Sequence, residues 1–144
     1  MRIGLVLSAW RGSDGIGANV LSAAAQSGAI TTTQDNSAIE LIIVDWAATD
    51  VTSRTWPNVN GAQPTEVTVG TDGGVYTWAV AYYADAGAAG SKTVGLSTPT
   101  LGTPDIIAVE IKGTTGGGGE VVDDSQSDYV PLDQASEPRT VGVW

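Results

Sequence analysis

Short runs of β-forming residues, separated by turn-forming residues, constrain the fold of this chain more than any other feature. The segments between the runs are rich in Gly, Pro, Asn and Asp, which supply the backbone conformations that turns need. This spacing is typical of β-sandwiches and β-barrels, so we expect an all-β, antiparallel β-sandwich with at most one short helix. The expected strands are residues 3–8, 39–46, 66–69, 75–84, 92–97 and 105–112.

Three of these runs are close enough in the chain to form hairpins. The pair Asp72-Gly73 suits a tight turn that joins residues 66–69 to residues 75–84. The small residues 86–91 then connect to the run at 92–97. The sequence therefore predicts a three-stranded antiparallel meander.

Side-chain alternation predicts which face of two strands lies in the core. In residues 75–84 the large aromatic side chains share one face and the small residues share the other, so we expect the aromatic face to meet a second sheet. In residues 105–112 the alternation predicts that Ile107, Val109 and Ile111 face the core. Glu110 is then expected to face solvent.

Residues 18–27 are the one candidate helix. With Gly12, Gly15 and Gly17 before them, they imitate the first unit of a dinucleotide-binding fold. The third glycine position of that fingerprint holds Val20, however, and no alternation of strand and helix follows. We therefore interpret the glycines as a connecting loop and expect no cofactor.

The chain contains no His and no Cys, which removes the commonest catalytic bases, nucleophiles and metal ligands. Its net charge of -10 disfavours nucleic acid and anionic membranes as partners, and no apolar run approaches the length of a membrane span. Carboxylate pairs can hydrolyse glycosides without His, but the spacing selects no pair. We therefore expect no enzymatic activity and no catalytic residue. The carboxylates considered are Glu40, Asp45, Glu66 and Glu110.

We expect one domain, with a β-sandwich core at residues 1–113 and a Gly-rich, acidic extension at residues 114–144 that ends in a short apolar strand. Asp123, Asp124 and Asp128 in that extension offer oxygen ligands for Ca²⁺, but their spacing matches no standard calcium loop. We therefore assign no metal ligand.

Three tryptophans are candidate interface residues. Trp10 and Trp56 lie in turn-like surroundings, and Trp144 ends the chain. Aromatic side chains at such places serve either as covers of the protein's own core or as contacts with a partner. Both alternatives remain open for each of the three.

The runs at 29–33, 39–46, 78–83, 90–94 and 106–113 resemble a recurrent β-sandwich domain of bacteriophage virion proteins and bacterial surface proteins. The resemblance covers about residues 29–113. Where members of that family have an Asp-Gly-Asn turn and a Trp, this chain has Thr55-Trp56-Pro57-Asn58. The resemblance implies a jelly-roll-like or immunoglobulin-like sandwich used for assembly or adhesion, and it carries no catalytic residues.

Size, acidity and this resemblance together favour a structural protein of a phage virion. The leading hypothesis is a capsid decoration or cement protein that forms homo-oligomers and binds capsid or head proteins by burying surface at subunit junctions. The alternative is a receptor- or carbohydrate-binding module of a head or tail fibre. In that alternative Trp10, Trp56, Tyr82 or Tyr83 stacks on a glycan.

Overall fold

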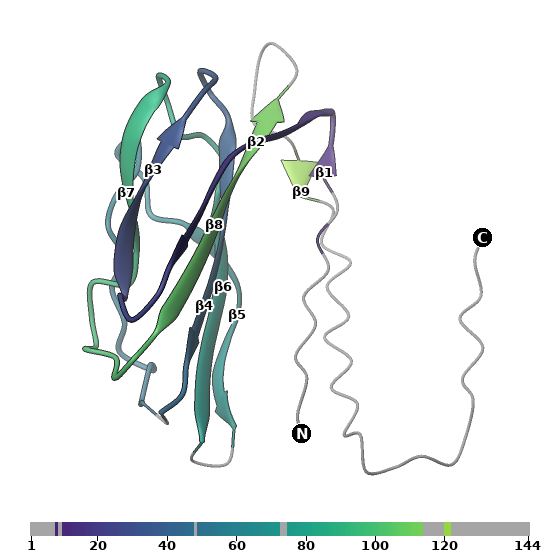
Figure 1. The fold of residues 1–144 in the computed structure, drawn as a ribbon. Coiled ribbons are helices and arrows are strands. Elements are labelled where there is room, and N and C mark those ends of the chain that lie inside the picture. Colours follow the sequence, from purple (N-terminus) through teal and green to yellow (C-terminus); the bar gives the residue numbers. More distant parts are fainter. Residues whose placement is uncertain (1–7, 9, 48, 73–74, 114–119, 122–144) are drawn as a thin grey trace, which may run out of the picture.

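The structure is a computed structural model that describes residues 8, 10–47, 49–72, 75–113 and 120–121. Two antiparallel sheets pack face to face as a sandwich (Figure 1). The larger sheet has five strands in the order β2-β8-β4-β6-β5, and the smaller pairs β3 with β7. The strands are β1 (Trp10–Arg11), β2 (Ser13–Ser22), β3 (Ser27–Thr32), β4 (Ala38–Asp45), β5 (Thr65–Asp72), β6 (Tyr76–Tyr83), β7 (Gly90–Gly95), β8 (Asp105–Gly113) and β9 (Glu120–Val121).

This architecture confirms the predicted all-β sandwich, and the five runs predicted between residues 39 and 112 are all strands. The predicted strand at 3–8 lies outside the described residues except for Ser8. The predicted hairpin between residues 66–69 and 75–84 is also confirmed, because β5 pairs antiparallel with β6.

Two local predictions are wrong. Residues 18–22 belong to strand β2 and residues 27–28 begin β3, so the expected helix at 18–27 is absent. The meander also stops after two strands, because β7 leaves the β5–β6 sheet and pairs with β3 in the other layer. In each case the backbone hydrogen bonds are made with a strand that is distant in the sequence. Local sequence does not reveal which distant strand will be the partner.

The core lies between the two sheets, and register shows which side chains face it. Ile39, Leu41 and Ile43 of β4 are buried there. Residues directly opposite each other in a sheet project to the same face, so the partners of these three on β6 and β8 also point inward. Those partners are Tyr83, Ala81, Ala79, Glu110, Ala108 and Ile106.

The predicted faces of β6 and β8 are therefore reversed. The small face of β6 enters the core, while Tyr76, Trp78 and Tyr82 lie on the outer face of the five-stranded sheet. On β8, Ile107 is 43% exposed and Glu110 is fully buried. The small side chains of β6 leave room for the large residues of β4 and of the opposite layer, because an interior packs by complementary volume.

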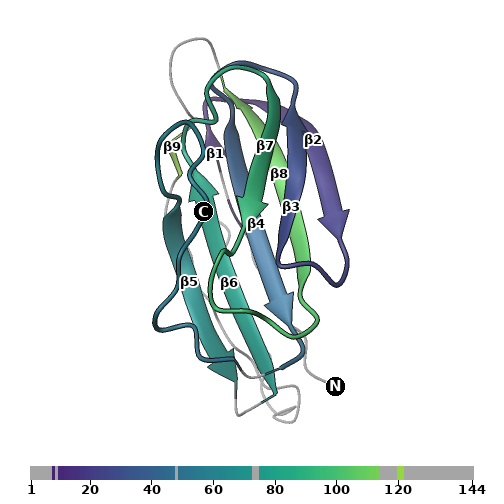
Figure 2. The same ribbon diagram turned by 90° about the vertical axis from the view of Figure 1, so that its left-hand side faces the viewer.

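A long connection completes the second layer. In Figure 2 the β3–β7 sheet lies in front of β8 and β4, and it leaves β5 and β6 to one side. The connection between β4 and β5 covers this side, where Val51, Trp56 and Val59 are buried in the core. Thr55 forms a β-bridge with Thr98, just after β7. The connection thus takes the place of a further strand.

Candidate functional interface

The outer face of the five-stranded sheet carries an apolar patch. One row of opposed residues crosses the sheet as Leu21, Ile107, Ile42 and Val80. The next row contains Val44 opposite Trp78. Pairs of this kind share one face of an antiparallel sheet. We call the set Ile16, Leu21, Ile42, Val44, Trp78, Ile107 and Val109 the outer patch.

Several members of the outer patch are strongly exposed. Ile16 and Leu21 on the edge strand β2 are each 69% exposed, and Ile107 beside them is 43% exposed. Single exposed apolar residues are normal, but a contiguous group on one sheet face indicates an interaction surface.

Two acidic side chains lie within the rows of this patch. Glu40 is directly opposite Val109, in the row between those of Ile16 and Ile42, and Asp105 is directly opposite Val44. The seven side chains of the outer patch are apolar, and these two carboxylates interrupt them.

Strand β1 lies on the outer side of the five-stranded sheet, the side that faces away from β3 and β7 (Figure 1). The indole N–H of Trp10 donates to Oε2 of Glu40 at 3.2 Å. Its ring meets Tyr82 edge-on, with centroids 5.5 Å apart. The hydroxyl of Ser8 donates to the same Oε2 at 2.7 Å. Trp10 therefore covers part of the outer face and borders the outer patch.

The other two predicted interface tryptophans have different outcomes. Trp56 is 6% exposed and packs in the hydrophobic core, where its indole N–H donates to Oε1 of Glu66. Of the two alternatives for Trp56, the structure shows the cover of the protein's own core, and the ring has almost no surface to offer a partner. Trp144 lies outside the described residues.

Sequence reasoning missed Trp46 as an interface candidate, because the residue closes an apolar run and was assigned to a strand interior. It lies just past the end of β4 and is 62% exposed. Its ring meets Tyr76 with centroids 5.2 Å apart at an interplanar angle of 69°. The pair extends the outer face beyond Val44 with exposed aromatic area. The alternation of residues 39–46 could have identified Trp46 as an outward-facing residue. It does so only when the inward face of β4 is known.

The buried carboxylate of Glu110 is a structural group. It accepts hydrogen bonds from the backbone N–H of Ala18 at 2.7 Å, of Thr33 at 2.8 Å and of Gln34 at 3.0 Å, and from the Thr33 hydroxyl at 2.9 Å. Burial raises the pKa of Glu110, but these hydrogen bonds lower it by more, so that it lies below its ordinary value. Glu110 thereby joins β8 to β2 and to the turn after β3.

Asp45 has a similar role toward the other end of β4. It is fully buried, and its two oxygens accept the backbone N–H groups of Gly102 and Thr103, each at 2.9 Å. These bonds hold the connection between β7 and β8 against the end of the strand. Buried charges are tolerated when they are hydrogen-bonded in this way.

Glu66, on β5, forms an ion pair with Arg54 and also accepts the indole N–H of Trp56. The hydrogen bond from Arg54, helped by that from Trp56, lowers the pKa of Glu66 despite some desolvation. All four carboxylates considered for catalysis thus have local partners on different parts of the fold. The structure does not bring them together as an acid and base pair.

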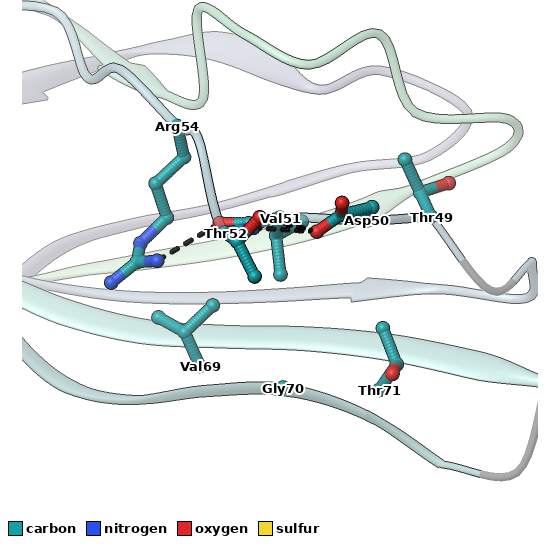
Figure 3. A pocket seen from close by; sticks show the side chains of 8 residues that line it. All are labelled: Thr49, Asp50, Val51, Thr52, Arg54, Val69, Gly70 and Thr71. Carbon is teal, nitrogen blue, oxygen red and sulfur yellow. Dashed lines mark hydrogen bonds between the residues drawn. The ribbon is translucent and has the colours of Figure 1, made fainter.

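A pocket of about 300 Å³ lies between β5 and the connection that follows β4 (Figure 3). Asp50 accepts hydrogen bonds from the backbone N–H and the hydroxyl of Thr52, which lower the pKa of its carboxyl. Arg54 donates to the carbonyl oxygen of Val51. The lining of the pocket contains no aromatic side chain, so the pocket offers no stacking surface for a sugar ring. The lining residues are Thr49, Asp50, Val51, Thr52, Arg54, Val69, Gly70 and Thr71.

Among the described residues, no group of three or more Asp, Glu, His or Cys is placed to hold a metal ion. The candidate calcium ligands Asp123, Asp124 and Asp128 lie outside these residues. Within the same part of the chain, no helix has the length and apolar character needed to span a membrane.

Comparison of the chain with protein-family models, curated proteins and solved structures gave no match.

Proposed function

We propose that this chain is a non-enzymatic structural protein of a bacteriophage virion, most specifically a capsid decoration protein. It acts by burying the outer patch against a capsid or head protein or against another copy of itself. The single observation that carries the proposal is the exposed apolar surface of the outer patch, in which Leu21 and Ile107 expose 69% and 43% of their surface. Burial of apolar surface is the dominant favourable contribution to most protein association.

The carboxylates support the non-enzymatic part of this proposal. Glu110 and Asp45 each hold backbone N–H groups in fixed positions, and Glu66 is paired with Arg54. Such groups stabilise a scaffold, and they are poorly placed to exchange protons with a substrate. The resemblance to virion domains supports the virion as the location.

Glycan recognition has less support than assembly. Of the aromatic residues that would stack on a sugar, Trp56 and Tyr83 are buried, and the hydroxyl of Tyr83 donates to the carbonyl oxygen of Pro57. Trp10 and Tyr82 contact each other. The exposed Trp46 and the half-buried Tyr76 offer aromatic surface for such a role, and a glycan array with Trp46→Ala tests it.

The decisive experiment measures association of the protein with itself, by light scattering, and with phage particles, by co-sedimentation. We expect the double variant Leu21→Asp/Ile107→Asp to lose association while it remains folded, because the two side chains already expose 69% and 43% of their surface and neither belongs to the core between the sheets. The matched control is Ser91→Asp/Thr93→Asp, at exposed positions of β7 in the other sheet. A protein that neither self-associates nor binds a particle would contradict the proposal.

A further inference from the structure

Strand β5 is an edge strand of the five-stranded sheet. Its neighbour in the sheet is β6, and after a register shift between Glu66 and Thr68 its residues 68–72 pair regularly with that strand. Alternate residues of an antiparallel edge strand point both the N–H and the C=O away from the neighbour. Within the described part of the chain, the backbone of residues 68–72 has no hydrogen bond beyond its pairing with β6. At least one residue in 69–71 therefore offers a free donor and a free acceptor at the edge.

The pocket beside β5 reaches this edge. Val69 and Thr71 face the inner side of the sheet, because they are directly opposite the buried Ala79 and Thr77 of β6, and both line the pocket. Gly70 lines it as well, although it has no side chain, so the pocket extends to the backbone of the strand. The connection that follows β4 lies across the pocket (Figure 3). The space under this connection is thus continuous with the edge of β5.

Register defines what an added strand would place in this space. Residues directly opposite each other project to the same face of a sheet. The residues of an added strand that are opposite Val69 and Thr71 would therefore point under the connection, into the pocket of about 300 Å³. Its apolar lining comes from Val51, which is 5% exposed, and from Val69, which packs against the core. Small aliphatic side chains are the ones that match this lining.

The charges at this edge favour a basic segment. Glu66 is already neutralised by its ion pair with Arg54. Asp50 is exposed at the pocket and takes its hydrogen bonds from Thr52 in its own loop, and no Lys or Arg among the described residues pairs with it. Strand β5 itself ends at another acidic residue, Asp72. A cationic side chain is attracted to such an edge, whereas a second copy would bring a second net charge of -10 to it.

We propose that β5 binds an extended, basic segment of a partner protein by strand addition. The segment pairs with the free edge at residues 69–71, places small aliphatic side chains in the pocket, and carries a Lys or Arg beside Asp50. In this mode of recognition, main-chain hydrogen bonds supply affinity and pockets for alternate side chains supply specificity. The site uses the edge and inner side of β5, whereas the outer patch lies on the outer face of the sheet. The inference therefore goes beyond the proposed function and does not rest on it.

Hydrogen exchange followed by NMR locates the binding, with short synthetic peptides in which Val alternates with Thr as the probes. One peptide carries Lys at both ends, and its control carries Glu. We expect the Lys peptide to slow the exchange of at least one amide in residues 69–71 by at least tenfold, and to bind at least tenfold more tightly than the Glu peptide. Unchanged exchange at residues 69–71 with both peptides would overturn the inference, and so would slowed exchange confined to the outer patch. Equal affinity for the two peptides would overturn the assignment of a basic partner.

N-methylated peptides separate strand pairing from side-chain contact alone. Methyl groups on the amides along one edge of the Lys peptide should abolish binding, while the same number along the other edge should leave the affinity within threefold, because a single edge pairs with β5. Equal effects of the two methylation patterns would overturn strand addition.

Substitutions at exposed positions test the pocket and the charge. Thr71→Arg fills the opening of the pocket and Asp50→Lys reverses the charge, so each should weaken binding of the Lys peptide at least tenfold. The matched control is Thr93→Arg, at an exposed position of β7, which should leave binding unchanged. Binding that is equal in all three variants would place the peptide elsewhere and overturn the inference. The double variant Leu21→Asp/Ile107→Asp should also leave peptide binding unchanged, so the proposed function and this inference can fail separately.

Discussion

Oε2 of Glu110 accepts the backbone N–H of Ala18 at 2.7 Å, although 92 residues separate the two in the chain. The bond lies where β2 contains a register shift, between Ile16 and Asn19. A β-bulge of this kind turns backbone groups away from the regular ladder. Here it directs one of them at a buried carboxylate, so the edge strand that carries Ile16 and Leu21 is held to the sheet by Glu110.

Replacing Glu110 with Gln should destabilise the fold by at least about 2 kcal/mol, because hydrogen bonds to a charged acceptor are worth about 1.5–3 kcal/mol each and several donors would face an amide. The free energy of unfolding in urea measures this. Asp14→Asn, at an exposed position of β2, is the control and should change stability by less than about 0.5 kcal/mol. Equal stability of the two variants would show that Glu110 does not hold the sheets together.

Acid should weaken the protein through the same carboxylate. The pKa of Glu110 lies below its ordinary value of 4.5 in the folded chain, so the folded state binds fewer protons than the unfolded state in this range. The stabilisation is complete above about pH 4.5 and is lost as the pH falls through the lower, folded-state pKa.

The measurement is the free energy of unfolding between pH 6 and pH 2.5, compared between the natural chain and Glu110→Gln. Glu66 and Asp50, whose pKa values are also lowered, contribute to both proteins. The variant should therefore show a shallower loss, and parallel pH profiles would rule out a contribution from Glu110.

Gly17→Ala should be destabilising by about 1–3 kcal/mol, the usual cost of overpacking. A Cβ at this position would overlap the carboxylate of Glu110, with Cγ of that side chain only 2.9 Å away. Gly102→Ala is the matched control, because its Cβ would meet Ala47 at an ordinary 3.5 Å. Thermal unfolding of both variants distinguishes the cases, and equal melting temperatures would contradict the packing described around Glu110.

Trp56 and Trp46 should respond oppositely to removal of the indole ring. Trp56→Ala should cost about 3–5 kcal/mol, the range for a large aromatic residue in a core. Trp46 is 62% exposed, and Trp46→Ala should change stability by less than about 1 kcal/mol. Urea unfolding measures both. Because Trp56→Ala disturbs the core, loss of glycan binding in that variant would not identify a sugar contact, whereas loss in Trp46→Ala would.

The sequence by itself determined the secondary structure of residues 39–46, 66–69, 75–84, 92–97 and 105–112, because β-forming residues between turn residues act locally. It also determined the sandwich class and the β5–β6 hairpin, whose short turn brings neighbouring strands together. The alternation in β6 and β8 also separated the residues of the outer patch from those of the core. It did not show which of the two faces is buried, and the prediction placed the outer face in the core.

Only the tertiary structure decided which face is inside. Both faces of β4, β6 and β8 are largely apolar, so period-2 alternation marks two faces without stating which of them is buried. The choice depends on what packs against each face: Ile30, Val94 and Trp56 come from distant segments and join the inward residues of β4, β6 and β8 in one hydrophobic core. Burial of Glu110 likewise depends on backbone N–H groups that only the folded chain brings together. A carboxylate that is costly to bury alone becomes stable there, and the apolar side chains opposite are left facing outward.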